Sequence, residues 1–474
     1  MFDILLSDQT HHPLYMQLYM QIRQHIRSGV IANGARLPSV RSLQLHLNIS
    51  KTPIETAFQM LSAEGYVVSK PRSGLFAVNP HEIGSTLQND IDSSQHLQDL
   101  QPSLRAPLAQ SYRIDFNPAA VDKDMFPIRT WRKMLHEVLE SFADDIGQYG
   151  DPHGEYAFRR ILADYLRNSR GVVCAPEQIV IGSGISHSIY ILTKLLSGVE
   201  HVAFEEPGYE TVREQFLLHG FKLIPITIHD KGLSLEELEK SKAQTVYTTP
   251  SHQFPTGSII PYAERTHLLD WANARNAYII EDDYDGEFRY IGKPIPSLQS
   301  LDQHGRVIYI GTFSKAFTPA LRMNYMVLPM NLVKKLAEIH LSLLSPSRID
   351  QWAMQAFIEK GHWYRHIRKM RNTYRKKHHR FIQLLHMHFA DYIDITGHSA
   401  GLHIQVTVKT HLNAQTLLKL AANDGVRVYN FQQMWMNQNE TGYPKIYLGF
   451  AGISEQDMER GVLLLRKAWG GILV

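Results

Sequence analysis

The sequence GTFSKAFTPALR, residues 311–322, follows an apolar run and places a lysine among hydroxyl side chains. A lysine in a sheltered crevice near another cation has a lowered pKa, and its amine can form an imine with an aldehyde. Arg322 follows Lys315 closely and can clamp a phosphate together with the hydroxyl of Thr312 or Ser314. An isolated Ser-Lys pair is usually a surface feature, but these hydroxyls and the arginine favour a site. The stretch therefore predicts that Lys315 binds a phosphate-bearing aldehyde cofactor.

Apolar runs typical of β-strands surround this stretch and alternate with amphipathic segments. Such alternation predicts an α/β domain with a mostly parallel sheet that is buried on both faces. Long helices and a mixed αβ tail follow Asp350, which predicts a smaller C-terminal lobe. The runs are Gln178–Ile181, His201–Phe204, Thr245–Thr248, Ala277–Glu281, Val307–Ile310 and Tyr325–Leu328.

Three further motifs of this domain can contribute to the same site. Residues 182–187, GSGISH, open a helix after a strand, and a helix N-terminus suits a phosphate, although a plain βα turn is as good an interpretation. Residues 278–284, YIIEDDY, place acids at a strand end, where a carboxylate can keep a pyridine nitrogen protonated. Acids at strand ends are common. Residues 249–257, TPSHQFPTG, form a stiff loop that can flank a ring or simply make a tight turn.

The N-terminal segment has a different pattern, with three helical stretches followed by two strand-like stretches. Ser39 and Ser50 can each cap a helix, and Gly65 can end the last one. The strand-like stretches Tyr66–Ser69 and Leu75–Val78 enclose a turn. This order predicts a winged helix-turn-helix.

Residues 1–80 carry seven Lys/Arg against four Asp/Glu, whereas the whole chain has a net charge of only +3. Such a local excess matters if the fold gathers it on one face. In a helix-turn-helix the second helix enters the major groove of double-stranded DNA, while flanking groups contact phosphates. The predicted DNA-binding residues of this domain are Arg36, Ser39, Arg41, Ser50, Lys51, Thr52, Lys70 and Arg72.

Composition sets the limits of the remaining interpretation. With 474 residues, 44% hydrophobic and 20% charged, the chain is typical of a globular protein of two or three domains. No apolar run is long enough to cross a bilayer, the N-terminus lacks a signal-peptide pattern, and Cys174 is the single cysteine. We therefore expect a cytoplasmic protein with no membrane partner. The 25 histidines show no clear metal-ligand spacing, so we expect no metal.

Several of these motifs together resemble known families. EDDYDGEFRY, GTFSKAFTPALRMNYMVLP, TTPSHQFPTG, EEPGY and YGDPHGEYAFRR are similar to the fold-type I aminotransferase domain. LPSVRSL, SKTPIETAFQMLSAEGYV and SGLFAV are similar to the GntR winged helix. Their fusion in this order resembles the MocR/GabR group of bacterial regulators over almost the whole chain. The expected domains are the winged helix at 1–79, a linker at 80–112, and the aminotransferase-like domain at 113–474 with its large lobe at about 145–335.

The resemblance implies pyridoxal 5'-phosphate as cofactor, bound to Lys315 as an aldimine, with Asp282 on the pyridine nitrogen. It implies Tyr284 near the 3-hydroxyl and Arg322 on the phosphate. Dimers of this family are head-to-tail, so a homodimer whose subunits share pocket groups is expected. Further residues implied for the pocket are Gly184, Ile185 and Ser186 in the phosphate cup, and Tyr209 and Tyr149 nearby.

Two departures from the family pattern bear on the effector and the operator. The GABA-responsive member holds a carboxylate with arginines, but the matching positions fall near Thr211 and Gly452, which argues against GABA. Arg213 is close and is the candidate substitute. In the winged helix, Lys51 and Glu55 stand where many relatives have an arginine and a basic residue.

Three functions remain open from the sequence. The first is a regulator that senses an amine, an amino acid or the cofactor itself through aldimine chemistry and changes its grip on operator DNA. The second is a working aminotransferase with an appended DNA-binding domain. The third is a DNA-binding protein with a vestigial scaffold, against which the retained Lys315, Asp282 and Arg322 argue. A basic stretch, residues 362–380, favours a solvated helix face of the small lobe over a second DNA site.

Overall fold

The computed structural model describes residues 4–7, 12–79, 112–291, 296–339, 346–437 and 442–474. The chain divides into two compact units, residues 1–110 and 111–474, each with its own core. The linker predicted at 80–112 lies outside the described residues apart from Tyr112. None of the described helices is long and apolar enough to span a membrane.

The described part of the first unit folds as a winged helix-turn-helix. Ser39 caps the second helix, because its hydroxyl accepts a hydrogen bond from the Ser42 amide at 3.1 Å. Asn48 adopts a left-handed conformation and makes the turn to the third helix. Ser50 occupies the N-cap position there, but its side chain makes no capping bond, so that part of the prediction is wrong. The elements are α1 (Leu14–Arg27), α2 (Val40–Leu47), α3 (Lys51–Ala63), β1 (Val67–Lys70) and β2 (Gly74–Ala77).

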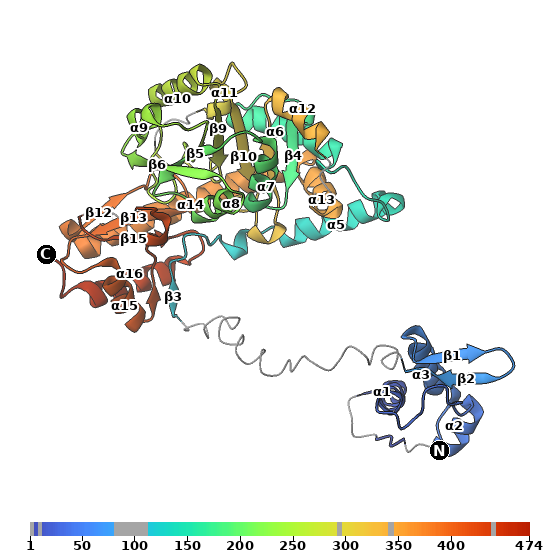
Figure 1. The fold of residues 1–474 in the computed structure, drawn as a ribbon. Coiled ribbons are helices and arrows are strands. Elements are labelled where there is room, and N and C mark those ends of the chain that lie inside the picture. The colour runs from blue at the N-terminus through green and yellow to red at the C-terminus, as the bar shows by residue number, and fades with distance from the viewer. Residues whose placement is uncertain (1–3, 8–11, 80–111, 292–295, 340–345, 438–441) are drawn as a thin grey trace. The chain divides into compact units, whose positions relative to one another are not determined.

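The described part of the second unit is built around an eight-stranded sheet that helices enclose (Figure 1). All six predicted strands belong to it, and no end differs from the prediction by more than two residues. The central strands are parallel, and antiparallel pairs lie toward both edges. The strands, in their order across the sheet, are β4 (Ile179–Gly182), β11 (Asn324–Val327), β10 (Val307–Thr312), β9 (Tyr278–Asp283), β8 (Thr245–Thr248), β5 (His201–Glu206), β6 (Lys222–His229) and β7 (Gly232–Leu233).

Most helices around the sheet follow its strands and cover its faces, as parallel strand connections require, whereas α5 and α6 precede the first strand and α13 follows α12. This arrangement brings the C-terminal ends of the parallel strands to one edge, where βα loops form ligand crevices. The helices are α5 (Ile128–Ser141), α6 (Tyr156–Arg170), α7 (Ile185–Leu195), α8 (Glu210–Leu218), α9 (Leu235–Lys240), α10 (Tyr262–Ala274), α11 (Leu298–Leu301), α12 (Met330–Glu338) and α13 (Arg348–Glu359).

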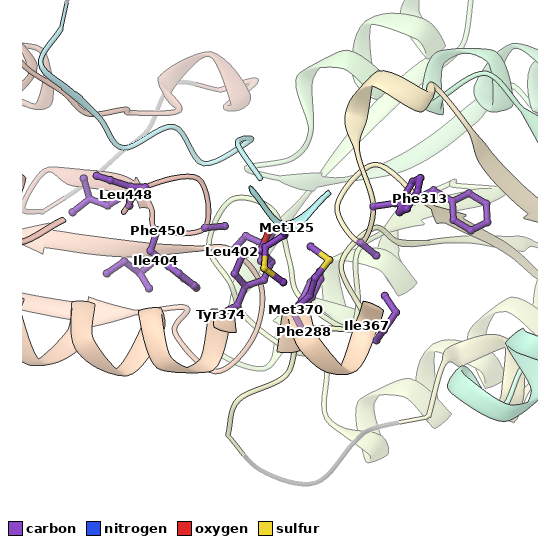
Figure 2. Close-up of a cluster of buried hydrophobic side chains, with 14 of the residues drawn as sticks. Met125, Phe288, Phe313, Ile367, Met370, Tyr374, Leu402, Ile404, Leu448 and Phe450 are labelled. Carbon is purple, nitrogen blue, oxygen red and sulfur yellow. The ribbon is translucent and has the colours of Figure 1, made fainter. Parts of the chain in front are cut away.

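The smaller lobe packs an antiparallel sheet against helices at the end of the long helix α14 (His362–Phe389). One hydrophobic cluster continues from the large lobe along α14 into this lobe, from Phe313 and Phe288 through Met370 to Phe450 (Figure 2). The lobes therefore share a core. The remaining elements are β3 (Ile114–Asp115), β12 (Ile393–Thr396), β13 (His403–Val408), β14 (Val426–Arg427), β15 (Lys445–Gly449), α15 (Ala414–Asn423) and α16 (Glu455–Trp469).

The basic stretch at 362–380 lies on α14, but it is not simply a solvated face. Lys377 is buried and pairs with Asp122 at 2.7 Å. Arg380 pairs with Glu459 at 3.0 Å, and Arg371 donates to the Glu287 carbonyl. The prediction of a solvated face is therefore wrong for Lys377, which the shared core of the lobes buries, whereas Arg371 stays exposed and Arg380 partly exposed.

Candidate functional site

A cavity of about 360 Å³ lies at the edge of the large sheet where the parallel strands end. It collects residues from five loops that follow β4, β5, β8, β9 and β10, together with two residues of the small lobe, Leu402 and His403. All of the residues predicted from sequence to bind the cofactor line it. They are Gly184, Ile185, Ser186, Tyr209, Asp282, Tyr284, Thr312, Ser314, Lys315 and Arg322.

Lys315 follows β10 and directs its amine into the cavity, where Nζ donates a hydrogen bond to the Ala119 carbonyl at 3.0 Å. Burial lowers the pKa of Lys315 to about 8, although the charge of Asp285 acts in the opposite direction. A lysine with this pKa is partly neutral near pH 7 and can attack an aldehyde. The amine thus has the reactivity that imine formation needs.

Asp282, near the end of β9, is buried at the base of the cavity. Its carboxylate accepts a hydrogen bond from the Tyr247 hydroxyl at 2.5 Å. Burial raises the pKa of Asp282 to about 7; the Tyr247 bond opposes this, and nearby carboxylates add to it. Among the described residues, no cation pairs with this carboxylate. A protonated pyridine nitrogen is the kind of partner that would compensate the buried charge.

Arg322 lies against the N-terminus of α7. A Cβ atom at Gly184 would come within 2.5 Å of the Arg322 guanidinium, so glycine permits this close approach. Arg322 itself takes a left-handed backbone conformation, with φ of 50°, which is costly for a side chain this large. In the described ranges it forms no ion pair. A guanidinium and a helix N-terminus that face the same space are both suited to an anion, and a phosphate fits there.

Tyr284, His252 and Asp285 form a hydrogen-bonded group beside Lys315. Nδ1 of His252 lies 2.8 Å from Asp285 Oδ2 and 2.9 Å from the Tyr284 hydroxyl oxygen. Burial disfavours the charged ring, but the Asp285 carboxylate outweighs it and raises the pKa of His252 above its ordinary value. The Tyr284 hydroxyl thus lies in the same cavity as Lys315, next to a buried histidine–carboxylate pair.

Several residues that line the cavity were not among the sequence candidates. Phe254, within the TPSHQFPTG loop, packs its ring 5.7 Å from that of Tyr209 and 6.0 Å from that of Tyr284. Tyr247 lies in an apolar run, where its hydroxyl gave no signal. His403 comes from the small lobe, and no local pattern could connect it with Lys315. Burial next to charged neighbours lowers the pKa of His403 to about 3.

The structure does not bring the two effector candidates into the cavity. Arg213 lies on α8 and donates to the Gln433 carbonyl at 2.8 Å, whereas Thr211 lines the cavity. Tyr149 is 87% exposed and lies outside the cavity of this subunit. Arg213 is therefore poorly placed to reach a ligand beside Lys315 without a rearrangement.

In the first unit all the predicted DNA-binding residues are exposed. Lys51, at the start of α3, forms an ion pair with Glu55 at 2.8 Å. On the wing, the Lys70 amine lies 4.6 Å from the centre of the Phe76 ring. Arg36 lies beside Gly74, where a Cβ atom would be 3.4 Å from the guanidinium. The face that a helix-turn-helix presents to DNA is therefore supplied with cations.

Comparisons with known proteins agree with both units. Residues 14–77 match the family "Bacterial regulatory proteins, gntR family", and residues 115–462 match "Aminotransferase class I and II". The kynurenine aminotransferase of Pyrococcus horikoshii has the same fold as the second unit, with a TM-score of 0.69 and 24% identity. The alignment covers 82% of this chain and 96% of that one. The class is thus a DNA-binding transcription regulator with an aminotransferase-like domain.

Full-length relatives narrow this class. The "Uncharacterized HTH-type transcriptional regulator YdeL" of Bacillus subtilis is 39% identical, and the alignment covers 96% of this chain and 97% of that protein. The "Probable rhizopine catabolism regulatory protein MocR" of Rhizobium meliloti is 31% identical, covering 98% and 96%. The "HTH-type pyridoxine biosynthesis transcriptional regulator PdxR" of Corynebacterium glutamicum is 30% identical, covering 79% and 80%. The chain belongs to the MocR-type regulators of the GntR family. The cofactor of their aminotransferase domain is pyridoxal phosphate.

Proposed function

We propose that this regulator senses a small amine or amino acid, or pyridoxal phosphate itself, at Lys315, and converts the occupancy of that site into altered binding of operator DNA. The observation that carries the proposal is the partly neutral Lys315 amine, which shares a cavity with the Arg322 guanidinium and with the Asp282 carboxylate, which has no cation partner among the described residues. When bound, pyridoxal phosphate supplies an aldehyde that amines attack and a ring that withdraws electrons.

The residues of the chain would divide the work as follows. Arg322 and the α7 N-terminus, with Thr312 and Ser314, hold the phosphate, and Asp282 keeps the ring nitrogen protonated. Tyr284 donates its hydroxyl proton to the 3-oxygen, and Phe254 and Tyr209 shield the site from water. An incoming amine competes with Lys315 for the same carbon. The free amine of Lys315 donates to the Ala119 carbonyl, so its release by an incoming amine would let this contact with the segment that precedes α5 form.

Signal transfer to DNA requires that the effector bind two conformations of the protein with different affinity. We propose a cytoplasmic head-to-tail homodimer in which Tyr149 reaches the partner's cavity, consistent with its exposure. A shift of the lobes would then alter the spacing of the two winged helices, and each would place α3 in a major groove. Half-site spacing is therefore the quantity that the effector controls.

The test compares the wild type with Lys315→Ala and a surface control, Lys334→Ala, on α12. We expect borohydride reduction to fix the cofactor mass on the wild type and on Lys334→Ala, and not on Lys315→Ala. A DNA fragment selected from a random library by the wild type serves as operator. Amines are screened for those that change the absorption spectrum of the wild type. An effector found in this way should change operator binding by the wild type and the control, and not by Lys315→Ala. Cofactor retention by Lys315→Ala after reduction would reject the proposal.

A second function, transamination, is favoured by the completeness of the site, since the lysine, the acid and the arginine are all present. Multiple turnovers with an amino acid and a keto acid, abolished in Lys315→Ala, would support it. A single half-reaction without turnover would favour the sensor. The ratio of product to protein distinguishes the two outcomes, because a half-reaction yields at most one product molecule per subunit and turnover yields more.

A further inference from the structure

A second cavity, of about 400 Å³, lies in the second unit, and five of its thirteen lining residues are arginines. They come from elements far apart in sequence: the end of α6, the helix α10, the segment after β9, and the long helix α14. Acids are in the minority among the described lining residues. The arginines are Arg170, Arg265, Arg289, Arg371 and Arg375.

Two of these arginines have their guanidinium groups fully engaged. Arg170 forms a bidentate ion pair with Asp283, with Nε–Oδ2 at 2.5 Å and Nη2–Oδ1 at 3.1 Å. Arg265 is completely buried and donates to the carbonyls of Ile260, Pro296 and Pro250. Its positive charge thus meets carbonyl dipoles directly, and the carboxylates of Glu281 and Asp283 act on it only at longer range.

The other three arginines form no ion pair with any described residue. Nε of Arg289 is buried and has no hydrogen-bond partner in the described structure. Burial and the charge of Arg170 lower the pKa of Arg289, which marks an unfavourable site for an uncompensated cation. Arg371 donates to the Glu287 carbonyl at 2.6 Å, and Arg375 stands exposed one helical turn further on. These three groups line the same cavity, and no described carboxylate forms an ion pair with them.

The acids that line the cavity do not balance this charge. Asp285 is already bonded to His252. Glu287 accepts a hydrogen bond from Tyr165, and burial, with the charge of Asp283, raises the pKa of Glu287 to about 7, so it is only partly ionised near neutrality. Both carboxylates are therefore weak counter-ions for the free guanidinium groups.

We propose that this cavity binds a small oxyanion with two negative charges, such as a phosphate monoester or a dicarboxylate. Guanidinium forks pair with such oxygens through charge-assisted hydrogen bonds. The Nε of Arg289 is buried and has no described partner, so a group that binds it has to enter the cavity. A small anion can do so, whereas the phosphates of a DNA backbone would meet the exposed Arg371 and Arg375 first.

The position of this cavity connects it to the cofactor site, in so far as the proposed function holds. Asp285 lines both cavities and joins them through His252 to Tyr284. The backbone of Arg289 is bridged to Ala400 of the small lobe, which also lines the second cavity. An anion would thus act on the same acid that raises the pKa of Lys315, and on the junction of the two lobes.

The test measures inorganic phosphate binding to the full-length holoprotein by calorimetry at constant ionic strength, because bound cofactor fills its own phosphate cup. We expect saturable binding that succinate displaces if dicarboxylates share the site. Arg289→Gln and Arg375→Gln should each weaken it about tenfold or more, since each removes a charge-assisted contact. Lys376→Gln, which removes an exposed charge from the same helix outside the cavity, should leave affinity within about twofold.

Absence of saturable phosphate binding to a folded holoprotein would overturn the proposal, as would equal losses in Arg375→Gln and Lys376→Gln. Weaker operator binding by Arg375→Gln with no phosphate site would assign these arginines to DNA instead. Coupling between this cavity and the cofactor site is measured separately. Phosphate should shift the absorption of the cofactor in the wild type, and Asp285→Asn should abolish this shift. Phosphate binding without this shift retains the site and rejects its link to the proposed sensing function.

Discussion

The two units of this protein hold their functional cations in opposite ways. In the cofactor cavity, burial lowers the pKa of Lys315, and Gly184 lets the more exposed Arg322 approach the N-terminus of α7 closely. On the winged helix, Arg41 and Lys51 are exposed, and their effect on DNA depends on charge and position alone. The comparison shows that one chain uses low dielectric for chemistry and a solvated surface for a polyelectrolyte partner.

This difference predicts the size of mutational effects. A buried group that is removed leaves its partners unsatisfied, so single substitutions in the cavity should cause large losses. Substitution of an exposed cation removes one of several phosphate contacts on the same face. Single substitutions there should therefore weaken DNA binding only moderately.

The largest effect is expected for Arg322→Ala in the cofactor cavity. It removes the guanidinium that lies against the α7 N-terminus, and we expect pyridoxal phosphate affinity of the apoprotein to fall about 100-fold. Fluorescence titration with the cofactor measures this. Arg275→Ala, whose guanidinium bonds only to two exposed carbonyls among the described residues, is the matched control. Equal affinity of Arg322→Ala and the control would remove Arg322 from the phosphate site.

A pH dependence follows from the lowered pKa of Lys315. Only the neutral amine attacks the aldehyde, so the rate of cofactor attachment should rise about tenfold per pH unit and level off above a pH of about 8. Because the charge of Asp285 raises the pKa of Lys315, Asp285→Asn should move this midpoint to lower pH. Stopped-flow absorption gives both profiles. A rate that still climbs steeply at pH 10 would show that Lys315 behaves as an exposed lysine.

The sequence predicted the local parts of the cavity well. The GTFSKAFTPALR and EDDY segments specify Lys315, Asp282 and Arg322 because each lies at a strand end, and parallel strands bring such ends to one edge. The winged helix was equally accessible, since its helices and hairpin are contiguous in sequence. In both cases the functional residues belong to short sequence motifs whose local structure already determines where they lie.

Contacts that join distant segments were not predictable. His403 reaches Lys315 from the small lobe, and Asp285 joins two cavities through His252, a pairing that no spacing reveals. The sequence predicted Lys377 as a surface charge, whereas the fold buries it next to Asp122. Strand β6, which carries a proline and intermediate burial along most of its length, gave no clear apolar run. These features arise from tertiary packing rather than from local pattern.

Intermediate effects are expected on the winged helix from Arg41→Ala and Lys51→Ala. Each should weaken operator binding about fivefold and reduce the slope of log K against log salt by about one, as for one lost phosphate contact. Gel-shift titrations at several salt concentrations measure both quantities. His46→Ala, at the other end of α2, serves as a control in the same unit. Unchanged affinity of both variants at physiological salt would reject this placement of the DNA face.

The smallest effect concerns the pair between Lys51 and Glu55 at the start of α3. At 2.8 Å this exposed i,i+4 pair holds the amine on the helix surface and places a negative charge beside the expected groove contact. Glu55→Gln should therefore tighten operator binding about two- to threefold, with a steeper salt dependence, because Lys51 becomes available to phosphate. The double variant Glu55→Gln, Lys51→Ala separates the two causes. If Glu55→Gln still tightens binding without Lys51, repulsion of the DNA by the carboxylate, rather than its ion pair, is the reason.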